Sequence, residues 1–142
     1  MKPIAGIIPL LLFCCMVDSD YALSQEVAVE IQPLTQNGIP YVSGGTGQDE
    51  KQAMTSIRKD YDFHATFALK KTGEYLADVG VTIQNPSGDK VFDGNSLGPL
   101  FFAKLPPGKY KITAVSDGKS QTQSILLNKS GTKDLYFYWE SE

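Results

Sequence analysis

The chain has 142 residues, 13 of them basic and 16 acidic, which gives a formal net charge of −3. This length fits one domain, and neither sign of charge dominates. Arg58 is the single arginine, whereas surfaces that bind nucleic acid or phosphate usually need several guanidinium groups. Length and charge therefore argue against a multidomain protein and against a nucleic-acid partner.

The first residues have the pattern of a secretory signal peptide. A basic start precedes the uncharged apolar run 4–17, and Ala22 and Ser24 then supply the small residues of a cleavage site. The run is shorter than the roughly 20 residues of a membrane-spanning helix, so cleavage leaves no membrane span. We predict a signal peptide over residues 1–24 and a single domain over residues 25–142.

The positions of the cysteines and the predicted signal peptide indicate the compartment in which the protein is expected. Cys14 and Cys15 are the two cysteines of the chain, and both belong to the predicted leader, so the mature protein has no disulfide. A lipid anchor is disfavoured, because the residue before a lipidated cysteine is small and Phe13 precedes Cys14. We predict a periplasmic protein, with full secretion as the alternative.

The first part of the predicted domain combines a strand, a turn and a helix. Alternating apolar residues predict a strand within residues 25–36, and Asn37-Gly38 predicts the turn after it. One short helix is predicted near residues 48–60, with four apolar residues at spacings of three and four: Ala53, Met54, Ile57 and Tyr61. We expect this helix at a sandwich edge or over one open end.

The rest of the chain predicts short strands separated by turns. Residues 100–103 are too short a run for a helix and predict a central strand, and Asp117-Gly118 predicts a hairpin. Alternation assigns one buried face to Phe63, Phe67, Val79, Val81, Ile83, Tyr110, Ile112, Ala114, Phe137 and Trp139. Seven or eight strands of this kind predict an all-β, immunoglobulin-like or transthyretin-like β-sandwich.

Three segments carry a resemblance to a known family: Val79-x-Val-x-Ile83, the Gly88 turn, and Leu105-Pro-Pro-Gly-Lys-Tyr110. Together they resemble the carboxypeptidase regulatory-like and Cna-B-type domains, over about residues 75–127. The preceding part of the chain is similar to small exported proteobacterial proteins that carry such a domain and have no assigned activity. Such domains serve as structural, adhesive or binding modules without shared catalytic residues, so the resemblance implies neither an enzyme nor a cofactor.

Asp60, Asp62 and His64 are the candidate metal ligands. If the strand already begins at Asp60, all three side chains project from one face, where two carboxylates and an imidazole suit a divalent ion. A polar outer face at a helix-to-strand junction is the competing interpretation. His64 is the single histidine and the sequence offers no evident fourth ligand, so we predict no metal site and no catalytic residue.

Four other residues are candidates for a binding surface. Alternation in the final strand points Tyr136 and Tyr138 outward. Asn95 and Lys109 belong to two loops, and we expect these loops at one end of the sandwich, because loops on a rigid scaffold carry most binding.

The sequence thus predicts an exported, non-enzymatic β-sandwich of the cell envelope that binds another protein or an envelope component, such as a glycan. A carbohydrate-binding or small-ligand module that uses the terminal tyrosines is the alternative. A metal-dependent enzyme centred on Asp62 and His64 is the third hypothesis.

Overall fold

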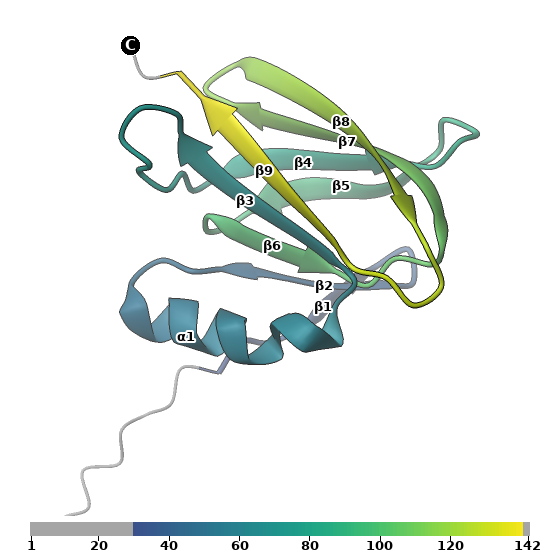
Figure 1. Cartoon of the computed structure of the whole chain (residues 1–142), viewed down its shortest axis with the longest axis horizontal. Coiled ribbons are helices and arrows are strands. Elements are labelled where there is room, and N and C mark those ends of the chain that lie inside the picture. Colours follow the sequence, from purple (N-terminus) through teal and green to yellow (C-terminus); the bar gives the residue numbers. More distant parts are fainter. Residues whose placement is uncertain (1–29, 141–142) are drawn as a thin grey trace, which may run out of the picture.

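Two β-sheets pack face to face in the computed structural model, which describes residues 30–140 (Figure 1). The five-stranded sheet has the order β1 (Leu34–Gln36), β2 (Ile39–Gly44), β6 (Leu100–Ala103), β3 (Phe63–Leu69) and β9 (Lys133–Trp139). The four-stranded sheet has the order β5 (Lys90–Ser96), β4 (Val79–Gln84), β7 (Gly108–Ser116) and β8 (Lys119–Leu127). The helix α1 (Gln48–Ile57) continues into the 3-10 turn η1 (Arg58–Asp60).

The predicted all-β sandwich with one short helix is confirmed, with nine strands in the described residues. The predicted signal peptide 1–24 lies outside the described residues, as does the first part of the strand predicted in 25–36. Within the described residues that strand is only Leu34–Gln36. Asn95 and Lys109, predicted in loops, both lie in strands, since β5 runs on to Ser96 and β7 begins at Gly108.

The main core lies between the two sheets. β4 and β7 alternate buried and more exposed residues, as the period of two predicts. Most of its aromatic rings come from the five-stranded sheet and most of its aliphatic side chains from the other. The residues of this core include Phe63, Phe67, Val79, Val81, Ile83, Phe92, Phe101, Ile112, Phe137 and Trp139.

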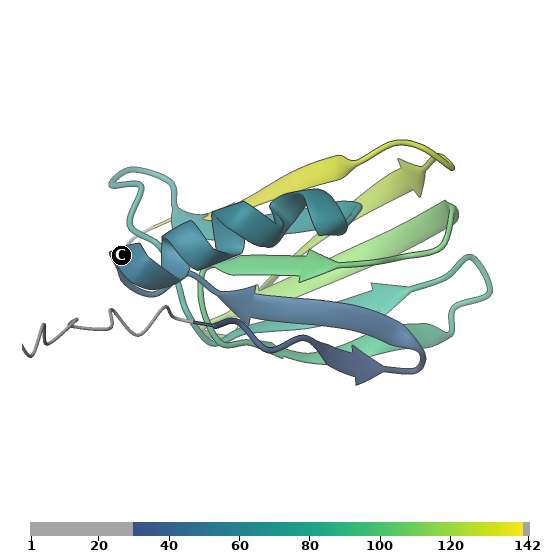
Figure 2. The same cartoon turned by 90° about the horizontal axis from the view of Figure 1, so that it is seen from below.

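The helix lies over the outer face of the five-stranded sheet, where the view from below shows it in front of the strands (Figure 2). This placement corrects the prediction of an edge or an open end. The reason is visible in β6, where Phe101 faces the main core and Phe102 faces outward, so the strand needs cover on both sides. Met54 of the helix packs there with Val42, Tyr61 and Phe102 in a second core.

The predicted turn at Asn37-Gly38 and the predicted hairpin at Asp117-Gly118 are confirmed by their backbone angles. Asn37 and Gly38 have φ values of 50° and 77°, and Asp117 and Gly118 have values of 50° and 73°. Two successive residues with positive φ form the turn that matches the twist of the flanking strands. These turns fix the register of β1 with β2 and of β7 with β8.

The strand β9 occupies one edge of the five-stranded sheet and runs parallel to β3, from Phe63 opposite Lys133 to Leu69 opposite Trp139. Its outer edge is covered by side chains of β8. Gln123 Nε2 donates to the Tyr136 carbonyl at 3.0 Å, and Gln121 donates to the Tyr138 carbonyl. These contacts hold β9 in place and satisfy backbone groups that an open edge leaves free.

Candidate functional site

Tyr136 and Tyr138 face solvent on the outer side of β9, as predicted. Each is 49% exposed, whereas Phe137 between them is fully buried. Their rings are nearly parallel, with an interplanar angle of 10° and centroids 6.3 Å apart. Two aromatic faces are therefore presented side by side on a strand whose backbone is fixed on both edges.

A third tyrosine joins this face. Tyr75 forms an isolated bridge with Ala68, and Ala68 is also the register partner of Tyr138, so the three residues stand in one row across the sheet. Tyr75 is 51% exposed, and Lys51 of the helix places Nζ 4.3 Å from its ring centroid. We call Tyr75, Tyr136 and Tyr138 the tyrosine surface. Tyr75 was not predicted from the sequence, because it precedes a strand and carries no alternation signal of its own.

The candidate metal ligands do not converge. Asp62 Oδ1 accepts a hydrogen bond from the Leu105 backbone N–H at 2.8 Å, which ties the start of β3 to the end of β6. Asp60 belongs to η1 and is exposed. No group of three histidine, cysteine or acidic side chains within residues 30–140 is arranged to hold a metal ion.

His64 lies in a different environment from the predicted polar outer face. It is 5% exposed and meets the Phe102 ring edge-to-face at 4.8 Å, beneath the junction of helix and strand. Its Nδ1 lies 2.6 Å from Asp134 Oδ1, and its Nε2 lies 2.8 Å from the Arg58 carbonyl oxygen. Both partners are acceptors, so only the ring that carries both protons donates to each. The role of His64 in this structure is to tie η1 to β9.

Asn95 and Lys109 do not share one end of the sandwich, which makes the prediction of a joint loop site wrong. β6 separates the two loops, so one loop precedes the strand and the other follows it at the opposite end. In the four-stranded sheet, Asn95 pairs with Gly80, whereas Lys109 pairs with Leu126 near the far end of β7. Both side chains are exposed, but they do not form one surface.

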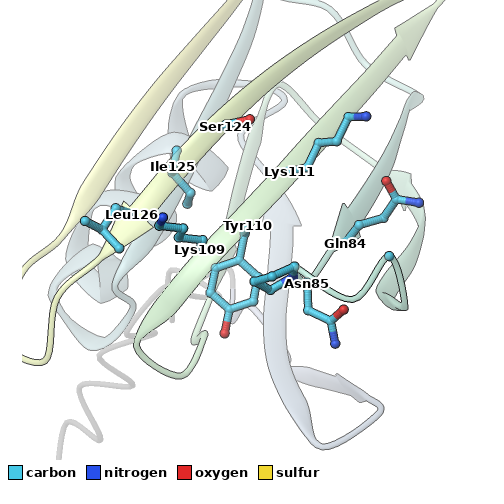
Figure 3. Close-up of a pocket in the computed structure, with 10 residues that line it drawn as sticks. Gln84, Asn85, Lys109, Tyr110, Lys111, Ser124, Ile125 and Leu126 are labelled. Carbon is cyan, nitrogen blue, oxygen red and sulfur yellow. The ribbon is translucent and has the colours of Figure 1, made fainter.

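Lys109 instead borders a hollow of about 620 Å³ on the outer side of the four-stranded sheet (Figure 3). β4, β7 and β8 contribute to its lining together with the turn that follows β4. We call this hollow the lysine pocket, and it is lined by Gln84, Asn85, Pro86, Gly88, Lys109, Tyr110, Lys111, Ser124, Ile125 and Leu126. The lining contains no acidic side chain.

The backbone around the lysine pocket is held by local hydrogen bonds. Asn85 Oδ1 accepts from the N–H groups of Ser87 and Asp89, both at 3.0 Å, and so shapes the turn. At the start of β7 the Tyr110 hydroxyl donates to the Pro106 carbonyl oxygen at 2.6 Å. This contact anchors the Pro-Pro-Gly segment before the strand.

Two buried tyrosines have shifted ionisation. Burial, and next the negative charge of Asp62, raise the pKa of Tyr110 above its usual value. Burial, and next Asp60, raise the pKa of Tyr61 in the same direction. Both hydroxyls therefore stay neutral at neutral pH, and Tyr110 acts as a hydrogen-bond donor in the fold, not as an acid or base.

Lys109 was predicted as a binding residue from the sequence, but the pocket around it was not. The signal was present in the strand periodicity, because Gln84, Lys111 and Ser124 are outward-facing residues of three strands. Only the register, in which Lys111 pairs with both Gln84 and Ser124, brings them into one row.

Comparisons with known proteins find similarity among solved structures, over part of the chain. No protein-family model and no curated protein matches the chain. Among solved structures, the chain is similar to the major pilin subunit of Bacillus cereus, with a TM-score of 0.44 and 12% sequence identity. The match covers 54% of this chain and 28% of the pilin chain, so it spans less than a third of the pilin's length.

Proposed function

We propose that this protein is a non-enzymatic binding module of the cell envelope that recognises another protein through the tyrosine surface. The observation that carries the proposal is the grouping of three half-exposed tyrosines on one sheet face. Tyrosine is enriched at protein interfaces, because its ring supplies apolar contact area and its hydroxyl remains hydrogen-bonded. A partner that covers these rings gains contact area from side chains already placed by the sheet.

A second candidate function follows from the parallel rings of Tyr136 and Tyr138. An interplanar angle of 10° gives two flat faces in one orientation, which suits the flat face of a sugar ring. In this alternative the module binds a neutral carbohydrate. The metal-dependent enzyme receives no support, because Asp62 and His64 engage separate partners and not a common centre.

The family resemblance and the export remain part of the proposal. Residues 75–127 are proposed to be a carboxypeptidase regulatory-like or Cna-B-type domain, and the Tyr110 hydroxyl bond to Pro106 gives its Pro-Pro-Gly-Lys-Tyr unit a structural role. Residues 1–24 are proposed to direct export to the periplasm and to be removed. Among residues 30–140, none of the helical segments has the length and apolar character of a membrane span. Mass spectrometry of the purified protein tests the cleavage, with Gln25 expected as the first residue.

Site-specific photo-cross-linking in intact cells tests the binding function. A photoreactive phenylalanine analogue at Tyr138 is expected to give a discrete adduct with one partner protein. The same analogue at Val115, which is 38% exposed on the outer face of the other sheet, serves as the matched control and gives no such adduct. Identical adduct patterns at the two positions, or none at Tyr138, contradict the proposal. A glycan array read with the protein and with Tyr136→Ala/Tyr138→Ala distinguishes the carbohydrate alternative.

A further inference from the structure

The lysine pocket concentrates positive charge in a chain whose net charge is −3. Lys109 and Lys111 are successive outward residues of β7, and both are exposed. Neither takes part in any of the ion pairs of residues 30–140, which are Arg58–Asp134, His64–Asp134, Lys70–Glu140 and Lys90–Asp93. Two ammonium groups without a neutralising partner, in a pocket without a carboxylate, create a local positive potential.

The two lysines reach toward different sides of the pocket. In Figure 3 the Lys111 side chain extends on the side of Gln84, whereas Lys109 lies toward Leu126. A ligand with a single anionic group binds only one of the two lysines, whereas a chain with repeated anionic groups binds both. The hollow is therefore better suited to an extended polyanion that crosses the sheet from β8 toward β4.

The other lining groups match a hydroxylated ligand. Ser124 offers a hydroxyl and Gln84 an amide, and both can donate to and accept from sugar hydroxyls. The side-chain oxygen of Asn85 is occupied by the turn, which leaves its amide nitrogen as a donor. Leu126 is 49% exposed and provides apolar contact at the rim. Amide and hydroxyl groups beside the two cations, with Gln84 and Ser124 flanking Lys111, suit a sugar chain that carries carboxylates.

We propose that the lysine pocket is a second binding site, on the sheet face opposite the tyrosine surface, for an acidic polysaccharide such as a polyuronate. Lys109 and Lys111 bind carboxylates on separate sugar units, and Gln84, Asn85 and Ser124 bind neighbouring hydroxyl groups of the same chain. The site does not depend on the proposed protein partner, because no residue is shared between the two surfaces. With both surfaces occupied, the module connects a protein to an acidic glycan.

The test is a titration of the purified protein with oligogalacturonate, followed by calorimetry and by amide chemical shifts. Shifts are expected at residues 84–88, 109–111 and 124–126. Lys109→Gln/Lys111→Gln is expected to lower the affinity at least about tenfold, as the loss of two charge-assisted contacts implies. Lys71→Gln/Lys129→Gln removes the same charge from two exposed turns and serves as the matched control, with affinity unchanged. Tyr136→Ala/Tyr138→Ala is also expected to bind oligogalacturonate like the unmodified protein.

Several outcomes overturn the proposal. Absence of binding contradicts the proposal. Equal affinity for a neutral galacto-oligosaccharide of the same length shows that the negative charge of the ligand is not recognised. Equal affinity for a single-stranded DNA oligonucleotide shows that the lysine pocket attracts polyanions in general and does not recognise a sugar chain. Equal losses in the two lysine double variants show that net charge and not the pocket is responsible. Loss of binding in the tyrosine double variant places the sugar on the tyrosine surface, while a retained photo-adduct at Tyr138 leaves the protein-binding function standing.

Discussion

The side chain of Gln36 pairs with the backbone of Asp93 across the gap between the two sheets. Gln36 Nε2 donates to the Asp93 carbonyl oxygen at 3.1 Å, and the Asp93 N–H donates to Gln36 Oε1 at 2.6 Å. Beside it, Asn37 Nδ2 donates to the Val91 carbonyl at 3.2 Å. The side-chain amides of Gln36 and Asn37 thus occupy the free edge of β5. Those of Gln121 and Gln123 occupy the free edge of β9 in the same way. Both sides of the sandwich are closed by amide side chains where another strand would otherwise pair.

Gln36→Ala is therefore expected to expose an edge strand. The lost pair of hydrogen bonds lowers the free energy of unfolding by about 1 kcal/mol, measured by urea denaturation. More diagnostic is association, because a free β5 edge pairs with a second copy, and light scattering is expected to show oligomers. Gln32→Ala, at an exposed glutamine with no such contact, is the control and stays monomeric. A monomeric Gln36→Ala protein contradicts the protective role.

His64→Ala is expected to loosen the attachment of η1 to β9. The variant leaves a cavity against Phe102 and removes both ring hydrogen bonds, which together cost about 2–3 kcal/mol of unfolding free energy. Asp134→Ala removes one partner of the same network, so the two changes are expected to be non-additive by more than about 0.5 kcal/mol. The double-mutant cycle, followed by urea denaturation, measures this coupling. Simple additivity shows that the Asp134 contact contributes nothing.

Gly98→Ala tests a close approach of two backbone segments. A Cβ atom at Gly98 overlaps the carbonyl group of Gly44 at the end of β2, and neither backbone atom of that group can rotate away. The expected loss is about 1–3 kcal/mol. Gly131→Ala is the matched control, because the nearest atom to its added Cβ is 3.8 Å away. The fluorescence of Trp139, the single tryptophan, reports unfolding of both variants.

The raised pKa of Tyr110 predicts that the free energy of unfolding falls at alkaline pH. Its pKa is raised in the folded state, so the unfolded chain releases this proton first, at a pH of about 10. The stabilisation is complete below that pH and declines as the pH rises toward the folded-state pKa, because the unfolded state then binds fewer protons. Tyr110→Phe lacks the ionisation and also lacks the bond to Pro106. Urea midpoints are expected to differ most at pH 8 and to converge toward pH 11, and a constant difference contradicts this.

Local sequence signals predicted much of the sandwich. The turns Asn37-Gly38 and Asp117-Gly118 follow from residues that tolerate positive φ, and the alternation in β4 and β7 follows from one buried face per strand. The position of the helix did not follow. Phe102 and His64 are buried on the outer face only because the helix covers it, and a single strand pattern does not show which element provides cover.

The candidate sites were predictable only in part, for a related reason. Tyr136 and Tyr138 were placed outward correctly, because one alternating strand decides their direction. The lysine pocket and the row formed by Tyr75, Ala68 and Tyr138 depend on register between segments distant in sequence. The same limit explains the error on Asn95 and Lys109, whose loops were grouped without knowing the path of β6.

The pairing of β3 with β9 also has a consequence for biogenesis. His64 and Asp134 are separated by 70 positions, so a nascent chain must hold the β3 segment unpaired on that side until β9 has been synthesised. Contacts between residues so far apart in sequence slow folding, so the polypeptide remains unfolded for longer. Under the proposed export, a translocation channel that accepts only extended chains would receive this chain before β3 and β9 have paired.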